Sequence, residues 1–209
     1  MCIRDSGETQ QVAAQTTSYL SSNDPMDRVK RSIVLIYAEA SGKASGVIGK
    51  GTGFVIRRRG SKVWILTNRH VIQNPEDGLP ASRLNVEFYL GRLPTGKVGQ
   101  RLAAEHHSER PDQQGSAPAQ DLALIVVDSA PPDVQPLALA NATGSLGSVQ
   151  TIGHPGNELW QDRFLPVLDV DTKEMILRGS MDYGGSGSPV LGAEGQVVGV
   201  IYDLSLIHI

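Results

Sequence analysis

The chain has 209 residues, of which 40% are hydrophobic and 20% are charged, and its formal net charge is −3. This balance excludes a disordered chain, which would contain too few apolar residues, and argues against a strongly basic nucleic-acid binder. No apolar run approaches the roughly 20 residues needed to span a bilayer. We therefore expect a globular protein with neither a nucleic-acid nor a membrane partner.

Short apolar runs separated by turn residues predict an all-β chain. Glycine occurs 23 times and proline 12 times, and the runs between them are rich in β-branched and aromatic residues. Many short strands of this kind are typical of antiparallel barrels or a sandwich. Residues 7–25 are polar and are expected to form a linker or arm. Strands are predicted at 32–39, 51–58, 62–67, 84–90, 98–104, 122–127, 148–152, 163–170, 174–178 and 196–202.

The two ends of the chain share an unusual property. Residues 1–6 (MCIRDS) back-translate to ATG TGT ATA AGA GAC AG, and the reverse complement of that DNA encodes residues 204–209 (LSLIHI). The DNA also resembles a transposase end sequence used in sequencing libraries. We therefore expect both segments to be adaptor-derived, with the natural chain cut on both sides. Cys2, the single cysteine, then supplies no disulfide, thiol nucleophile or metal ligand.

The strongest local motif is Gly-Gly-Ser-Gly-Ser-Pro-Val at residues 184–190. A serine flanked by glycines suits nucleophilic acyl transfer, because glycine lets backbone N–H groups approach a developing oxyanion. Taken alone, the motif also fits an ordinary turn between strands.

Two further residues lie at the ends of predicted strands. His70 follows the apolar run at 62–67, and Asp121 precedes the run at 122–127. Each alone also fits a strand end or a loop. Together with Ser186 they follow the order His, Asp, Ser, which is that of the chymotrypsin-type triad, whereas an α/β-hydrolase has the order Ser, Asp, His.

The three motifs TNRHV, DLAL and GGSGSPV resemble those of trypsin-like serine peptidases of the chymotrypsin clan, and most closely the bacterial HtrA/Deg and glutamyl-endopeptidase branch. GTGFVI at 51–56 and GHPG at 153–156 also resemble that branch. The resemblance implies an all-β fold of two six-stranded antiparallel barrels within residues 26–203, at about 30–130 and 135–203. The last strand and a C-terminal helix are expected to be missing. The resemblance favours a location outside the cytoplasm.

The resemblance also implies roles for the three residues. Ser186 would be the nucleophile, His70 the general base and then the general acid, and Asp121 the residue that orients His70. The oxyanion hole would be formed by Gly184, Gly185 and Ser186, with the N–H groups of Gly184 and Ser186 as donors.

The residues at the specificity-pocket positions would be Ser180, Met181, Ile201 and Tyr202. No acid lies at Ser180, where a trypsin-like acid would be, which predicts a small or apolar side chain before the scissile bond. Glutamyl endopeptidases carry a histidine where Ile201 lies, so glutamate specificity is not expected. Gly185 replaces the aspartate of zymogen-activated trypsins, so that activation switch is not expected either.

No metal or organic cofactor is implied, and the expected partner is a protein or peptide substrate. The adjacent His106 and His107 lie in a polar stretch and are interpreted as solvated loop residues, and His154 is interpreted as structural. Two other functions remain open: a catalytically inactive binding or regulatory module on the same fold, and an esterase-like serine hydrolase.

Overall fold

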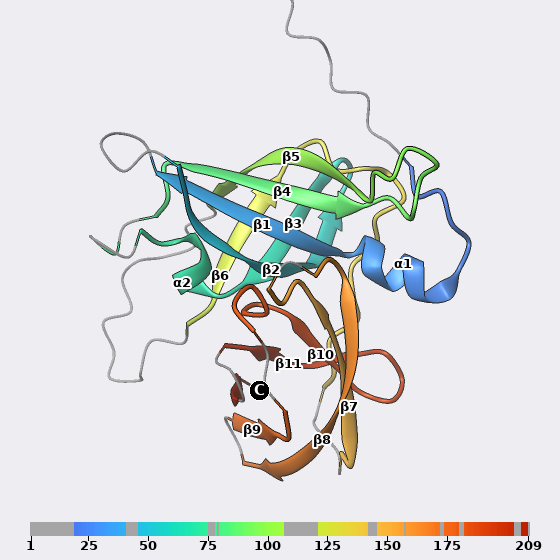
Figure 1. Cartoon of the computed structure of the whole chain (residues 1–209), viewed down its shortest axis with the longest axis vertical. Helices are drawn as coiled ribbons and strands as arrows, with labels where there is room; N and C mark the ends of the chain where they lie inside the picture. The colour runs from blue at the N-terminus through green and yellow to red at the C-terminus, as the bar shows by residue number, and fades with distance from the viewer. Residues whose placement is uncertain are drawn as a thin grey trace, which may run out of the picture.

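Two closed antiparallel β-barrels of six strands each make up most of the computed structural model, one above the other in Figure 1. The structure describes residues 19–40, 46–74, 78, 80–106, 121–141, 146–156, 158–171, 174–179, 182–202 and 206–208. In order around the first barrel, the strands are β1 (Ile33–Ala40), β2 (Gly46–Arg59), β3 (Lys62–Thr67), β6 (Ala123–Val127), β5 (Gly99–His106) and β4 (Arg83–Tyr89). In the second they are β10 (Pro189–Leu191), β11 (Val197–Ile201), β12 (Leu206–His208), β9 (Glu174–Leu177), β8 (Gln161–Val170) and β7 (Ser148–Gly153). The predicted all-β double barrel is confirmed.

The first barrel follows from the alternation of its strand sequences. In β3 and β4 every second residue is buried, including Val63, Ile65, Val86 and Phe88, while the residues between them face outward at least in part. A period of two places one set of side chains inside a barrel and the other outside. The apolar interior therefore fixes which way the strand ends, and the loops that follow them, project.

The second barrel differs from the prediction on one point. The last strand was expected to be missing, but Leu206–His208 forms β12 and pairs with both β9 and β11. The reason lies in the backbone. Strand edges carry rows of unpaired N–H and C=O groups, and any extended segment, whatever its origin, satisfies them.

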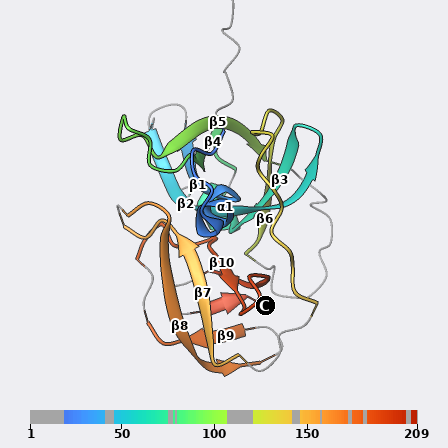
Figure 2. The same ribbon diagram turned by 90° about the vertical axis from the view of Figure 1, so that its right-hand side faces the viewer.

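Besides the apolar cores of the two barrels, a separate apolar cluster joins one barrel to the other. It contains Ile33 and Phe54 from the first barrel, Ile152 and Leu191 from the second, and Trp160, all nearly inaccessible to solvent. Figure 2 shows the two barrels next to each other, with α1 (Pro25–Arg31) where they adjoin. The barrels therefore share one continuous interface, at whose edge loops from both sides meet.

The helix α1 was not predicted, although its start has an ordinary signal. The Asp24 side chain accepts a hydrogen bond from Met26 N, and Pro25 occupies the first helical turn. Its last residue, Arg31, is buried and pairs with Asp133 in the connection between the barrels. Among the described residues, neither helix is long and apolar enough to cross a membrane.

Candidate active site

His70 lies on a short helix that follows β3. This helix, α2 (Arg69–Ile72), is preceded by Asn68. Val71 and Ile72 are buried in the core of the first barrel, whereas the His70 side chain is 47% exposed. The apolar residues anchor the helix, and the imidazole is left at the rim of the barrel.

The Asp121 carboxylate holds His70 through two hydrogen bonds. Its Oδ1 accepts from His70 N at 3.0 Å, and its Oδ2 is hydrogen-bonded to His70 Nδ1. The Asp121 carbonyl accepts from Arg69 N at 3.2 Å and from the Asn68 side chain at 2.8 Å. Because β3 and β6 are neighbours in the barrel, the residues just beyond their ends meet at one rim. The two predicted residues therefore form one hydrogen-bonded unit.

The ionisation of the Asp121 carboxyl follows from its surroundings. Burial raises the pKa of Asp121, but hydrogen bonds from the side chain and backbone of His70, with the charges of His70 and Arg69, outweigh it, and the net pKa is lowered. An ionised carboxylate only accepts hydrogen bonds, so the shared hydrogen is on Nδ1. In the tautomer with its hydrogen on Nδ1, the imidazole has Nε2 as its proton acceptor.

Ser186 lies in a tight loop just before β10. Gly185 N donates to Asp182 O at 3.0 Å, and Ser188 N donates to Gly185 O at 3.1 Å. The Ser186 carbonyl accepts from Thr52 N, on β2 of the other barrel, at 2.8 Å. The N–H of Gly185 is already hydrogen-bonded inside the loop. Of the three residues predicted to form the oxyanion hole, Gly185 therefore offers no free N–H to a substrate.

The conformation at Gly184 fixes the direction of its N–H group. Gly184 has φ = +97°, and a Cβ there would lie 2.4 Å from the carbonyl oxygen of His154. The preceding carbonyl, Tyr183 O, accepts from Gly156 N at 2.7 Å. The C=O and N–H of a trans peptide point in opposite directions. The Gly184 N–H therefore points away from the GHPG turn.

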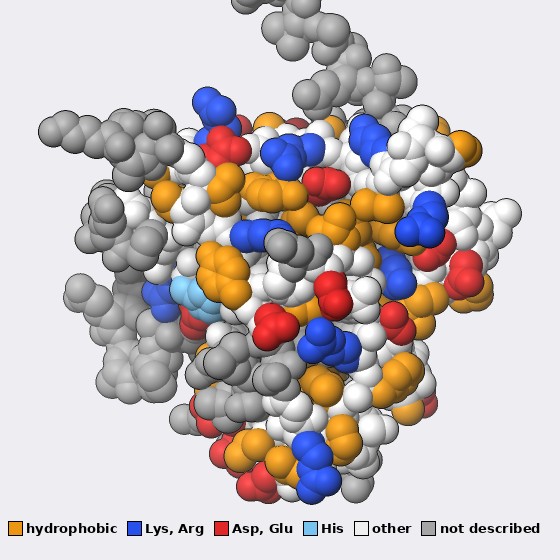
Figure 3. Space-filling model, in the orientation of Figure 1, with side chains coloured by type: hydrophobic (Ala, Val, Ile, Leu, Met, Phe, Trp, Pro, Cys, Tyr) orange, Lys and Arg blue, Asp and Glu red, His pale blue; other side chains and the backbone are white. Residues whose placement is uncertain are grey.

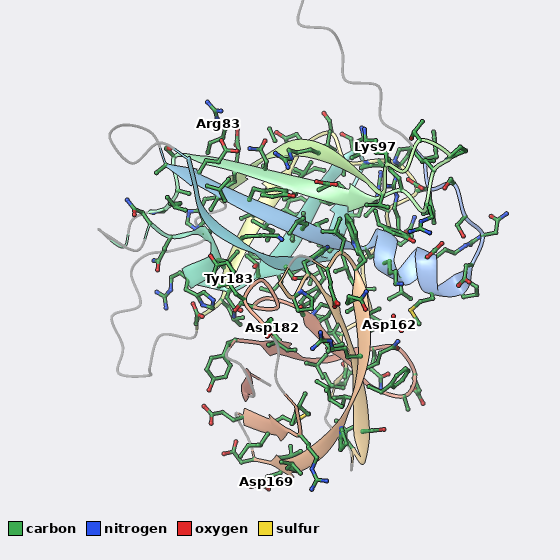
Figure 4. All side chains as sticks on the ribbon, in the orientation of Figure 1. Arg83, Lys97, Asp162, Asp169, Asp182 and Tyr183 are labelled. Carbon is green, nitrogen blue, oxygen red and sulfur yellow. The ribbon has the colours of Figure 1, made fainter. Side chains whose placement is uncertain are left out.

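A cavity of about 630 Å³ is lined by His70, Gly184 and Ser186, and by the predicted pocket residues Ile201 and Tyr202. Asp182 and Tyr183, which also line it, lie where the second barrel meets the first (Figure 4). The other predicted pocket residues, Ser180 and Met181, lie outside the described residues. The remaining lining residues are Ile48, Gly49, Lys50, Val71, Gln73, Asn74 and Gly78.

Residues that the sequence analysis did not assign to the site lie directly behind it. Thr67 Oγ1 donates to Thr52 O at 2.6 Å, and Thr52 Oγ1 donates to Gly184 O at 2.9 Å. Both threonines are fully buried. The available signal was a polar residue, Thr52, at the start of the otherwise apolar GTGFVI run, together with a histidine in the GHPG turn.

His154 is also fully buried, and its ring packs edge-on against Trp160 with 4.6 Å between the ring centroids. Burial, with a smaller contribution from the charge of Lys50, lowers its pKa to about 3. The side chain is therefore neutral in the folded protein at any ordinary pH.

We expect this burial to make the fold sensitive to acid. Between pH 6.5 and about 3 the unfolded chain binds a proton at residue 154 that the folded chain does not. The free energy of unfolding should therefore fall as the pH is lowered through this range, by up to about 1.4 kcal/mol per pH unit from this group. Urea unfolding of the wild type and of His154→Gln at several pH values isolates the effect. Equal slopes in the two proteins would contradict it.

Two other kinds of site, a metal site and a surface of one charge sign, find less support in the described part of the chain. It contains no group of three or more histidine, cysteine or acidic side chains placed to hold a metal ion, and His107 lies outside it. On the face shown in Figure 3, acidic and basic side chains are interspersed, with no large area of one sign.

Comparison with known proteins agrees with this architecture. Residues 51–200 match the family model of the trypsin-like peptidase domain. The chain is 32% identical over 161 residues to a relative from Synechocystis sp. named "Putative serine protease HhoA", a match that covers 74% of this chain and 36% of that protein.

Two solved structures share the fold. The serine endoprotease from Yersinia pestis superposes with a TM-score of 0.61 at 18% identity, covering 89% of this chain and 62% of that one. Deg5 superposes with a TM-score of 0.61 at 20% identity, covering 87% and 85%. The match to the family model covers more than half of the chain, so this chain belongs to the family of trypsin-like peptidase domains, with HtrA/Deg-type relatives.

Proposed function

We propose that this chain is a serine endopeptidase that hydrolyses peptide bonds through an acyl-enzyme on Ser186. The observation that carries the proposal is the pairing of His70 with Asp121 at the rim of the cavity that Ser186 also lines. The pair comes from the first barrel and the serine from the second. This arrangement supports the proposal, because a candidate nucleophile and an oriented candidate base line the same cavity.

In the proposed reaction, Ser186 Oγ attacks the carbonyl carbon of the scissile peptide while its proton passes to His70 Nε2. Asp121 stabilises the imidazolium that results. The N–H groups of Gly184 and Ser186 donate to the oxyanion of the tetrahedral intermediate. His70 then gives its proton to the departing amine as the C–N bond breaks. A water molecule repeats the sequence on the acyl-enzyme and releases the acid, so protons and electron pairs balance.

The side chain of Ile201 supports the proposal of a small or apolar residue before the scissile bond. Ile201, which is 3% exposed, presents an aliphatic side chain to the cavity. An aliphatic wall binds an apolar side chain by removing both surfaces from water, and it offers no hydrogen bond to a charged one.

Labelling with a fluorophosphonate probe tests the proposal. Wild type should react covalently at Ser186, and Ser186→Ala and His70→Ala should not, because an unactivated serine hydroxyl is a weak nucleophile. Circular dichroism spectra of all three proteins serve as the folding control. Absence of labelling in a folded wild type would leave the binding-module alternative. Labelled protein that cleaves nitrophenyl esters but no member of a peptide library would favour the esterase alternative.

A further inference from the structure

Thr52 connects the first barrel to the loop that carries Ser186. Its side chain is completely buried, and its Oγ1 lies within hydrogen-bonding distance of three groups. These are Gly184 O at 2.9 Å, His154 N at 3.2 Å and His154 Nδ1 at 3.0 Å. One hydroxyl therefore contacts both the oxyanion segment and the GHPG turn.

The number of hydrogens decides the direction of each bond. A hydroxyl has one hydrogen to donate and two lone pairs to accept with. A carbonyl oxygen only accepts, so the hydroxyl hydrogen of Thr52 goes to Gly184 O. The backbone N–H of His154 and its ring atom Nδ1 must then both donate to Thr52 Oγ1. The hydrogen of the neutral ring is therefore on Nδ1. The pKa of about 3 agrees, because a neutral ring carries one hydrogen. All three hydrogen-bonding positions of the Thr52 hydroxyl are thus used.

This assignment leaves Nε2 of His154 as a bare acceptor. The atom is buried and has no hydrogen-bond partner within the described residues. An unpaired buried acceptor costs free energy. An apolar side chain at position 154 would avoid the cost of the unpaired Nε2. What histidine supplies at this position, and an apolar residue would not, is the side-chain hydrogen bond from Nδ1 to Thr52.

The bond to Gly184 O orients the segment that carries the proposed oxyanion donors. The two consecutive glycines, Gly184 and Gly185, give this segment wide backbone freedom. Gly156 N holds the carbonyl on one side of Gly184, and Thr52 Oγ1 holds the carbonyl on the other. Each peptide is planar, so the bond to Tyr183 O fixes the N–H of Gly184, and the bond to Gly184 O fixes the next peptide, which leads to Ser186. Together the two bonds set the backbone angles at Gly184, and with them the relative placement of the two proposed donors, Gly184 N–H and Ser186 N–H.

We propose that Thr52 and His154 are positioning residues for the oxyanion hole, acting as a buried hydrogen-bonded pair that holds Gly184 O away from the cleft. The inference rests on the proposed peptidase function. It gives the GTGFVI strand, which contains Thr52, and the GHPG turn, which contains His154, a shared role in stabilising the transition state. Neither Thr52 nor His154 is proposed to touch the substrate.

The test compares Thr52→Val with Thr52→Ser. Valine keeps the shape of threonine and removes the hydroxyl, so kcat for a peptide nitroanilide with alanine before the scissile bond should fall about 10- to 100-fold at nearly constant KM. Affinity for a boronic acid analogue of the same peptide, which forms a tetrahedral adduct, should fall by a similar factor. Serine keeps the hydroxyl and should restore most of both quantities.

Thr151→Val is the matched control. Thr151 is equally buried, and its Oγ1 donates to Pro189 O at 3.0 Å, outside the oxyanion segment. It should lower thermal stability less than Thr52→Val, because it removes one buried hydrogen bond and not three, and it should leave kcat within about threefold.

The outcomes separate the two proposals. If the wild type reacts with the fluorophosphonate but Thr52→Val retains the kcat and boronic acid affinity of Thr151→Val, the positioning role is wrong and the peptidase proposal stands. If a folded wild type does not react at all, both proposals fail.

Discussion

Replacing His70 with alanine is expected to lower kcat for peptide hydrolysis by about a million-fold. The reason is that His70 both removes the proton from Ser186 and returns it to the leaving amine, so its loss disables acylation and deacylation together. Single-turnover assays with a peptide nitroanilide, followed over days, measure the residual rate. Substrate binding should change little, since the imidazole is one of many groups that line the cavity.

Asp121→Asn is the matched control for this prediction. An asparagine amide can donate to Nδ1, which would move the ring hydrogen to Nε2 and remove the atom proposed to accept the serine proton. We expect a smaller loss, about ten-thousand-fold in kcat, at unchanged fold. A His70→Ala protein with more than a hundredth of wild-type activity would show that another group is the base.

Gly187→Ala is expected to be the most destabilising single substitution proposed for this chain, lowering the free energy of unfolding by about 4 kcal/mol or more. Gly187 has φ = +84°, and a Cβ there would lie 2.0 Å from Thr52 O and 2.6 Å from Thr67 Oγ1. The first of these atoms belongs to the backbone of β2, so relief of the clash requires the Ser186 loop, or its whole barrel, to move away from β2. Urea unfolding followed by tryptophan fluorescence measures the loss.

Gly195→Ala separates backbone strain from this clash. Gly195 has a similar φ of +77°, but no heavy atom lies within 4 Å of the place where a Cβ would be. It should lose only about 1–2 kcal/mol, which is the cost of a left-handed conformation for alanine. Equal losses in the free energy of unfolding for Gly187→Ala and Gly195→Ala would contradict this prediction, because they would show that the clash with β2 adds nothing to the backbone strain.

The sequence allowed most strands to be predicted because they carry their own signal, whereas their arrangement in two six-stranded barrels was predicted from the resemblance to trypsin-like peptidases. Alternation in β3 and β4 and the apolar runs of β6 and β11 are local patterns that any barrel interior requires. The three-residue strands β10 and β12 are too short to show a period. They exist because neighbouring strands offer unpaired backbone groups, and that pairing depends on the assembled sheet.

Some residues of the candidate site also carry a local sequence signal, and others do not. His70, Asp121 and Ser186 could be proposed as candidates because each is embedded in a short motif and their order is informative. Thr52 and His154 could not be, because their contact spans 102 residues and joins two barrels. A buried threonine and a neutral histidine look like ordinary core residues until the hydrogen bonds between them are known.

The contact between Thr52 N and Ser186 O crosses from one barrel to the other. The Thr52 amide therefore exchanges its hydrogen with solvent only when the barrels part or the loop leaves β2. The same parting would separate Ser186 from His70. Undocking of the barrels and loss of the proposed catalytic centre are thus a single thermodynamic event, and each barrel could remain folded while the chain as a whole is inactive.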